Sequence, residues 1–246
     1  IAGYLITAQS RSRPNEPARD WFCKMRADEL LAKILPEVIK KSGIEPEEID
    51  DFLVGCATGV SEQWAYGGRT PIFLANLPET IAAKFVDQQC GSAMAGIHVG
   101  FMEIAMDFAD IVLVGGVEKM TDVGGDEATY ALATASDQEW EAFNGITFPG
   151  LYAMMAVAHM HRYGTTTQQL ASVAVKNHAN GLLNPNAQFH LKVTIEDVLQ
   201  STMVADPLHL LDCSPVTDGA AAMVLTTVER AKELGGDRPI VKITGS

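Results

Sequence analysis

The chain has 246 residues, of which 47% are hydrophobic and 20% charged, so it can bury the core of one large domain or two modest ones. Its formal net charge of -13 excludes a general nucleic-acid-binding surface, because such surfaces collect cations around the phosphate backbone. The same acidity is compatible with an anionic ligand such as a nucleotide, which a local basic patch can hold.

The four cysteines are widely spaced, and no CxxC motif or Cys/His cluster accompanies them. We therefore expect no metal site and no disulfide framework. No uncharged apolar run has the length of a membrane span, and no signal peptide is visible. A cytoplasmic protein without a membrane partner is the expectation.

The amino-terminal part begins with an apolar segment and a basic loop. Residues 2–8 predict a short buried strand, and residues 9–26 predict a polar loop. Five basic side chains cluster in this loop. They form either a solvated surface or a contact for a partner subunit or a phosphate. They are Arg11, Arg13, Arg19, Lys24 and Arg26.

The next elements follow from the spacing of apolar residues. Apolar side chains at three- and four-residue steps predict a helix over residues 27–42, and Gly43 suits the left-handed position after its end. Residues 46–50 predict a capped turn. Residues 52–57 predict a second strand, in which Cys56 is most simply a core residue.

The most informative stretch passes from a strand into a helix around Cys90. Residues 82–86 predict the strand, and the apolar run from Met94 to Phe108 predicts a helix that is buried on all sides. At the turn between them, unpaired N–H groups and the helix dipole favour the thiolate, the nucleophilic form of cysteine, and can hold an oxyanion. A lone cysteine is more often a small buried side chain, but a further strand at residues 110–120 converges here.

A polar insertion follows. Residues 122–150 are acidic, contain few periodic apolar residues and predict a mobile segment. His159 and His161 are two residues apart on a predicted helix, so they face different directions and do not form a metal pair. Helices are predicted over residues 147–162, 165–182 and 194–199.

The carboxy-terminal part returns to apolar segments. Residues 204–213 predict an extended stretch, and Asp218–Gly219 predict a tight turn that leads into a buried strand at 220–226. A helix is predicted at 228–234 and a last strand at 239–245.

Three of these stretches resemble the thiolases. Residues 86–95 (VDQQCGSAMA) and 109–120 (ADIVLVGGVEKM) are similar to the family's nucleophile segment, N/D-R-Q-C-x-S, then a helix and D-I-x-x-A-G-G-x-E-x-M, with Gln88 where arginine is usual. Residues 212–225 (DCSPVTDGAAAMVL) are similar to the S-G-x-N-D-G-A-A segment, with Thr217 in place of asparagine. The branch most resembled is the archaeal and bacterial acetyl-CoA acetyltransferases, related to the sterol-carrier-protein thiolases.

The resemblance implies an α/β, thiolase-like layered fold: a mixed five-stranded sheet with helices on both faces, plus an inserted, mostly helical loop domain. It implies an amino-terminal core at 1–120, a loop domain at 121–210 that covers the nucleophile and holds coenzyme A, and a return to the core at 211–246. It also implies a dimer interface at the loop around Trp64 and Tyr66, although these aromatic residues equally suit loop anchors.

The resemblance further implies the chemistry. Cys90 would be the catalytic nucleophile, and Ser214 would lie along the pantetheine arm of coenzyme A, although turn chemistry explains Ser214 and Asp218 equally well. The substrates would be acetyl-CoA, acetoacetyl-CoA or another 3-oxoacyl-CoA, without a resident cofactor. An acyl-enzyme would form on Cys90 and pass its acyl group to a second coenzyme A, or two acetyl-CoA molecules would condense.

The family's second half is missing from the sequence. Neither the GHP motif, whose histidine activates the nucleophile, nor the CxGGG motif, whose cysteine is an acid/base, is present. The chain would then be a piece of a longer product, one subunit of a split enzyme, or a thiolase-like protein without turnover. The first two are favoured, because a last strand at 239–245 would leave an edge or a core face uncovered. We expect a second thiolase half or subunit and a dimer or tetramer.

Two alternative functions stay open. One is a non-catalytic acyl-CoA-binding or scaffold subunit of a multi-enzyme complex, and the other is a condensing enzyme similar to 3-oxoacyl synthases or HMG-CoA synthase. The reactivity of Cys90 separates an enzyme from a scaffold. The glycine pair and glutamate at 115–118 favour a thiolase over the synthases.

Overall fold

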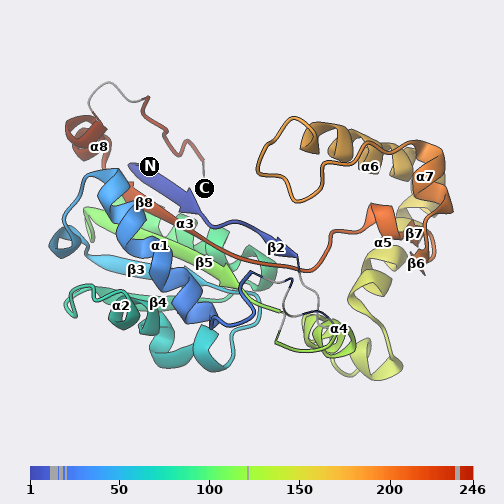
Figure 1. The fold of residues 1–246 in the computed structure, drawn as a ribbon, viewed down its shortest axis with the longest axis horizontal. Helices are drawn as coiled ribbons and strands as arrows, with labels where there is room; N and C mark the ends of the chain where they lie inside the picture. Colours follow the sequence, from blue (N-terminus) through green and yellow to red (C-terminus); the bar gives the residue numbers. More distant parts are fainter. Residues whose placement is uncertain (12–15, 17–18, 20, 121, 236–238, 246) are drawn as a thin grey trace. The chain divides into compact units, whose positions relative to one another are not determined.

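The computed structural model describes residues 1–11, 16, 19, 21–120, 122–235 and 239–245, and its contacts divide the chain into two compact units (Figure 1). The core unit comprises Ile1–Ser10, Glu16–Asp122 and Thr217–Ser246. The insertion unit comprises Arg11–Asn15 and Val123–Val216. The candidate nucleophile Cys90 belongs to the core unit.

A mixed sheet forms the centre of the core unit, which confirms the predicted α/β fold. Strands β3, β4 and β5 are parallel, and β8 runs antiparallel to both β5 and β1. A two-residue strand, β2, also pairs with β8 and was not predicted. The strands are β1 (Gly3–Ile6), β8 (Thr217–Thr226), β5 (Ile111–Glu118), β3 (Asp51–Gly55) and β4 (Ala82–Val86) in sheet order, with β2 at Ser10–Arg11.

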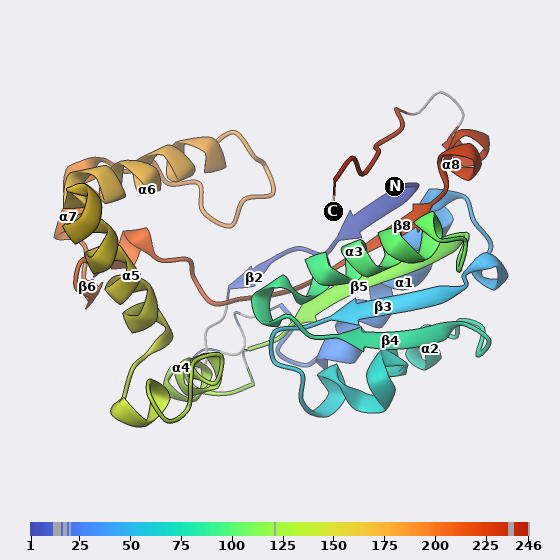
Figure 2. The same ribbon diagram turned by 180° about the vertical axis from the view of Figure 1, so that it is seen from behind.

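Helices cover both faces of this sheet (Figure 2). Helix α1 (Ala27–Ser42) packs on one face against β1, β5 and β8, with α2 (Thr70–Leu74) beside it. Helix α3 (Ser92–Ala105) packs on the other face against β3, β4 and β5. Because both faces are covered, the inner strands are continuous apolar runs; all five residues of β3 are buried.

Helix α1 has the predicted limits. Its apolar stripe, including Leu31 and Leu35, is buried in the core. Gly43 ends the helix in the left-handed conformation at φ 77°, as predicted. At the other end, the guanidinium of Arg26 donates to the buried carboxylate of Asp28 at 2.8 Å, so at least one cation of the basic loop fastens a helix.

Helix α3 departs from its prediction, because it is not buried on all sides. Small residues lie against the sheet: a Cβ on Gly96 would lie 3.2 Å from Val114, and one on Gly100 would lie 3.0 Å from Val112. On the outer face of α3, Met94 is 65% exposed and Met102 is 51% exposed. The apolar run therefore places apolar residues on two faces of the helix. The sheet covers the inner face, and the outer face stays exposed in this chain.

Three other predictions are wrong. Asp218 and Gly219 form no turn, because they lie inside β8, where Gly219 pairs with Glu118. Residues 239–245 form no strand, although Ile243 packs against the apolar cluster beneath α3. The segment 122–150 contains an unpredicted helix, α4 (Gly125–Ala133).

The insertion unit is mostly helical. Helix α6 begins with a reciprocal cap, in which Thr166 Oγ1 accepts from Gln169 N at 3.3 Å and Thr166 N donates to Gln169 Oε1 at 2.8 Å. Among the described residues, no helix combines the length and apolar character needed to cross a membrane. The elements are η6 (Ala142–Asn144), α5 (Phe148–Tyr163), α6 (Thr167–Gly181), α7 (Ile195–Gln200), β6 (Met203–Ala205), β7 (Leu208–His209) and η7 (Leu210–Asp212).

Short helical turns and one last helix complete the core unit. The remaining elements are η2 (Pro46–Glu48), η3 (Ser61–Gln63), η4 (Ala65–Gly68), η5 (Gln89–Gly91) and α8 (Val228–Gly235).

Candidate active site

Cys90 lies in a tight turn, η5, between β4 and α3, and its side chain is exposed. The turn is closed by its own side chains: Asp87 Oδ1 accepts from Gln89 N at 3.0 Å, and Ser92 Oγ accepts from Gln88 N at 2.8 Å. Gln89 adopts a positive φ of 51°, a conformation that few non-glycine residues adopt. The turn thus presents Cys90 to solvent just before the first turn of α3.

Two glycines bring this helix close to the sheet. Gly55 on β3 and Gly116 on β5 are register partners, and Ala93 lies directly over both. A Cβ on Gly55 would lie 2.4 Å from Ala93 N, and one on Gly116 would lie 2.7 Å from Ala93 Cβ. Any larger residue would displace the start of α3, so these glycines set the height of the Cys90 turn above the sheet.

Glu118, at the end of β5, binds the loop that follows β3. Its Oε2 accepts from Ala57 N at 2.8 Å and from Thr58 N at 3.3 Å. The thiol of Cys56 donates to the same carboxylate, with Sγ 3.6 Å from Oε1 and 3.5 Å from Oε2. Cys56 is buried, as expected of a core residue, but its polar contact was not predicted.

Backbone groups just after Glu118 are also held by side chains. Lys119 N donates to Gln63 Oε1 at 3.2 Å, and Met120 N donates to Asp218 Oδ1 at 2.7 Å. Asp218 is fully buried. The carboxyl ends of β3, β4 and β5, where open α/β sheets bind their ligands, are therefore built from polar contacts.

We expect the four thiols to react at different rates with iodoacetamide. Burial, and secondarily the charge of Glu118, strongly raise the pKa of Cys56, so its reactive thiolate is suppressed. Burial also raises the pKa of Cys213. Peptide mapping after alkylation at pH 8 should show the exposed Cys90 modified first and Cys56 at least about 100-fold more slowly. Equal rates would contradict this structure of the site.

Ser214, the predicted pantetheine contact, is exposed in the segment between η7 and β8, and it belongs to the insertion unit. Its role stays a prediction.

In the basic loop, Arg19 pairs with Glu16 at 2.6 Å and Lys24 is exposed, whereas Arg13 lies outside the described residues. His159 Nδ1 is 2.9 Å from Thr165 Oγ1. The described part of the chain contains no group of three or more His, Cys, Asp or Glu side chains placed to hold a metal ion.

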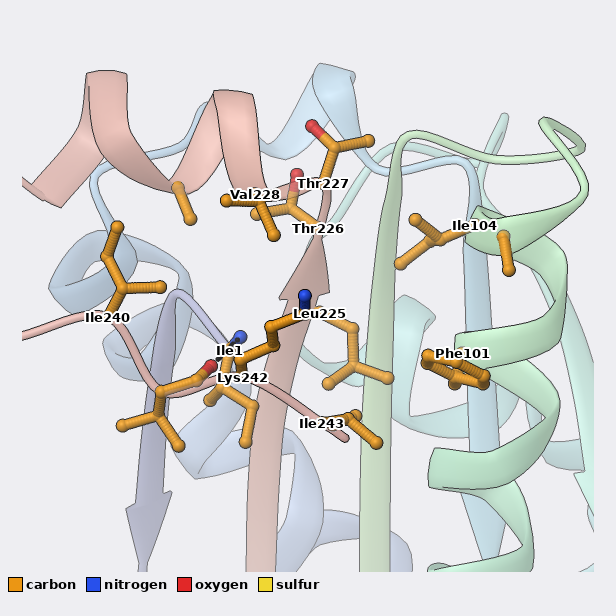
Figure 3. A pocket seen from close by; sticks show the side chains of 13 residues that line it. Ile1, Phe101, Ile104, Leu225, Thr226, Thr227, Val228, Ile240, Lys242 and Ile243 are labelled. Atoms are coloured by element: carbon orange, nitrogen blue, oxygen red, sulfur yellow. Dashed lines mark hydrogen bonds between the residues drawn. The ribbon is translucent and has the colours of Figure 1, made fainter. Parts of the chain in front are cut away.

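A cavity of about 130 Å³ in the core unit lies away from this site. Figure 3 shows Phe101, Leu225 and Ile243 around it, at the end of the sheet where β5 begins. Cys90 and Glu118 lie at the opposite end, where the parallel strands finish. A larger open hollow of about 660 Å³ lies in the insertion unit, along α5 beside Ala205 and Asp206.

The family model and the curated relatives give the same family. The thiolase amino-terminal domain matches residues 5–229. An acetyl-CoA acetyltransferase of Methanothermobacter thermautotrophicus is 48% identical over 79% of this chain and 50% of its own length. Another, of Methanocaldococcus jannaschii, is 41% identical over 88% of this chain and 55% of its own length. The chain thus spans about half the length of these relatives.

The fold agrees as well. The crystal structure of the Bacillus anthracis acetyl-CoA acetyltransferase matches with a TM-score of 0.75 and 21% identity, covering 96% of this chain and 66% of that chain. The chain belongs to the thiolase family and contains the amino-terminal domain of that family.

Proposed function

We propose that this chain is the nucleophile-bearing half of an acyl-CoA thiolase of the acetyl-CoA C-acetyltransferase type, and that Cys90 is the nucleophile. The observation that carries the proposal is the placement of Cys90: an exposed thiol before the first turn of α3, above the carboxyl ends of the parallel strands. The glycine pair Gly55 and Gly116 fixes that placement. The identity to archaeal acetyl-CoA acetyltransferases supports the same reaction class.

In the proposed reaction, the Cys90 thiolate attacks the 3-oxo carbon of a 3-oxoacyl-CoA such as acetoacetyl-CoA. The bond between the second and third carbons breaks, an acyl thioester remains on Cys90, and a proton donated to the departing carbanion completes acetyl-CoA. The thiol of a second coenzyme A then takes the acyl group and restores Cys90. Backbone N–H groups at the start of α3 support the oxyanion in both steps.

A second thiolase half or subunit supplies the acid/base histidine and cysteine in this proposal. The outer face of α3 supports a place for it, because Met94 and Met102 are both more than half exposed there. Trp64 and Tyr66 are 57% and 81% exposed, which supports a dimer contact at their loop. The complete assembly is then a dimer or tetramer in the cytoplasm.

The insertion unit holds the pantetheine arm of coenzyme A in the same proposal. Its open hollow is lined mostly by small and apolar side chains of α5, including Ala153 and Met154, which suits an uncharged chain. Ser214 contributes a hydroxyl to the amide groups of that arm.

The test is acetoacetyl-CoA thiolysis by the purified chain, with and without a polypeptide that carries the missing thiolase half. The chain alone is expected to form one acyl-enzyme and then stop, whereas the combined protein turns over steadily. Steady turnover by the chain alone would contradict the need for a second half. Binding of acetyl-CoA without any acylation of Cys90 would favour the scaffold alternative.

A further inference from the structure

One carboxylate fastens an entire loop that lies against the strand leading to Cys90. We call the residues Cys56–Gly59 the β3 loop. Three successive donors of this loop, the thiol of Cys56 and the N–H groups of Ala57 and Thr58, all converge on the carboxylate of Glu118. Because all three donors share this one acceptor group, Glu118 determines where this loop lies.

The β3 loop lies against the elements that carry the nucleophile. At its far end, a Cβ on Gly59 would lie 2.8 Å from the ring of Phe85, which belongs to β4, the strand leading to Cys90. At its near end, it follows Gly55, on which the first turn of α3 rests. A shift of the loop is therefore transmitted to both sides of the Cys90 turn.

Gln63 fastens the same loop a second time. Its Nε2 donates to Thr58 O at 2.6 Å, and its Oε1 accepts from Lys119 N at 3.2 Å. The amide thus connects the β3 loop to the residue that follows Glu118. Glu118 and Gln63 together close a ring of hydrogen bonds between the end of β5 and the loop after β3.

We propose that Glu118 is a positioning residue for acyl transfer at Cys90: it acts through the β3 loop and touches no reacting atom. This inference rests on the proposed function, because it concerns the nucleophile of that reaction. Reactions between bound groups depend steeply on geometry, and a displacement of about 1 Å lowers rates by about 100-fold. A small free reagent that meets an exposed thiol has no such requirement.

Two substitutions of Glu118 separate geometry from charge. Glu118→Gln keeps an oxygen that accepts from Ala57 and Thr58 and places its NH₂ group against the Cys56 sulfur, a weak acceptor. Glu118→Ala removes every acceptor. In purified protein mixed with acetyl-CoA, we expect Cys90 acetylation within about 3-fold of wild type for Glu118→Gln and about 30- to 100-fold slower for Glu118→Ala.

Alkylation of Cys90 by iodoacetamide is the readout that distinguishes positioning from general damage to the fold. It should stay within about 2-fold of wild type in both variants, because it needs an exposed thiolate but no bound and aligned substrate. Glu37→Ala, an exposed glutamate on α1, is the matched control and should change neither rate. If Glu118→Ala does not fold, Gln63→Ala replaces it, with acetylation expected to be about 10-fold slower.

Each result has one meaning. Equal acetylation in wild type and Glu118→Ala, or in wild type and Gln63→Ala where that variant replaces it, overturns the inference while the proposed function stands. A loss in Glu118→Gln as large as in Glu118→Ala also overturns it, because charge rather than loop position would then matter. Absence of acetylation in wild type overturns the proposed function itself, and the inference with it.

Discussion

Replacing Cys90 by serine is expected to lower acetyl transfer from acetyl-CoA at least about 1000-fold. A serine hydroxyl keeps its proton at neutral pH, whereas the cysteine thiolate is the attacking species. The side chain is exposed, so the substitution should leave stability within about 0.5 kcal/mol of wild type. Single-turnover acetylation and thermal unfolding measure the two quantities.

Cys23→Ser is the matched control for that experiment, because Cys23 is a free, partly exposed cysteine elsewhere in the core unit. It should retain the wild-type rate of acetyl transfer. A Cys90→Ser variant with more than about a tenth of that rate would remove Cys90 from the role of nucleophile.

Replacing Gly55 by alanine is expected to destabilise the fold by about 3 kcal/mol, as for an overpacked core position. The new Cβ would lie 2.4 Å from Ala93 N, a backbone atom that moves only if α3 moves. The displaced helix also carries the Cys90 turn, so acetylation of Cys90 should fall in the folded fraction. Urea unfolding gives the free energy difference.

Gly125→Ala tests whether the effect comes from the contact rather than from losing a glycine. Gly125 begins α4, and a Cβ there would meet nothing within 4 Å. This variant should be as stable as wild type or slightly more stable. Equal stability of Gly55→Ala and Gly125→Ala would contradict the close packing of α3 on the sheet.

Local patterns predicted most elements of the core unit, because their limits are encoded nearby. The strand at 82–86 ends where the chain becomes polar, and α1 ends at a glycine. Helix α3 could not be predicted fully from such patterns. An apolar run indicates that a helix contacts apolar surfaces, but it does not indicate whether the same chain supplies those surfaces. The strand predicted at residues 239–245 was wrong for a related reason. A strand forms only where the edge of a neighbouring strand is available to pair with it, and the local sequence does not reveal that.

The candidate site was predicted in part. Cys90 was singled out from the strand, turn and helix around it and from the resemblance to thiolases, and its role as nucleophile stays a prediction. The contact between Cys56 and Glu118 joins residues 62 apart in sequence and depends on the register of β3 with β5, which no local pattern contains. Asp218 was placed in a turn because Asp-Gly favours turns, yet its side chain is used inside a strand.

The central claim is that Cys90 carries the acyl group, and one measurement tests it most directly. The purified protein is incubated with radiolabelled acetyl-CoA, denatured at low pH to preserve thioesters, and mapped by peptide mass spectrometry. We expect a single acetyl group on the peptide that contains Cys90, and its loss when coenzyme A is added before denaturation. Label on another residue, or no label with acetyl-CoA bound, would contradict the role of Cys90.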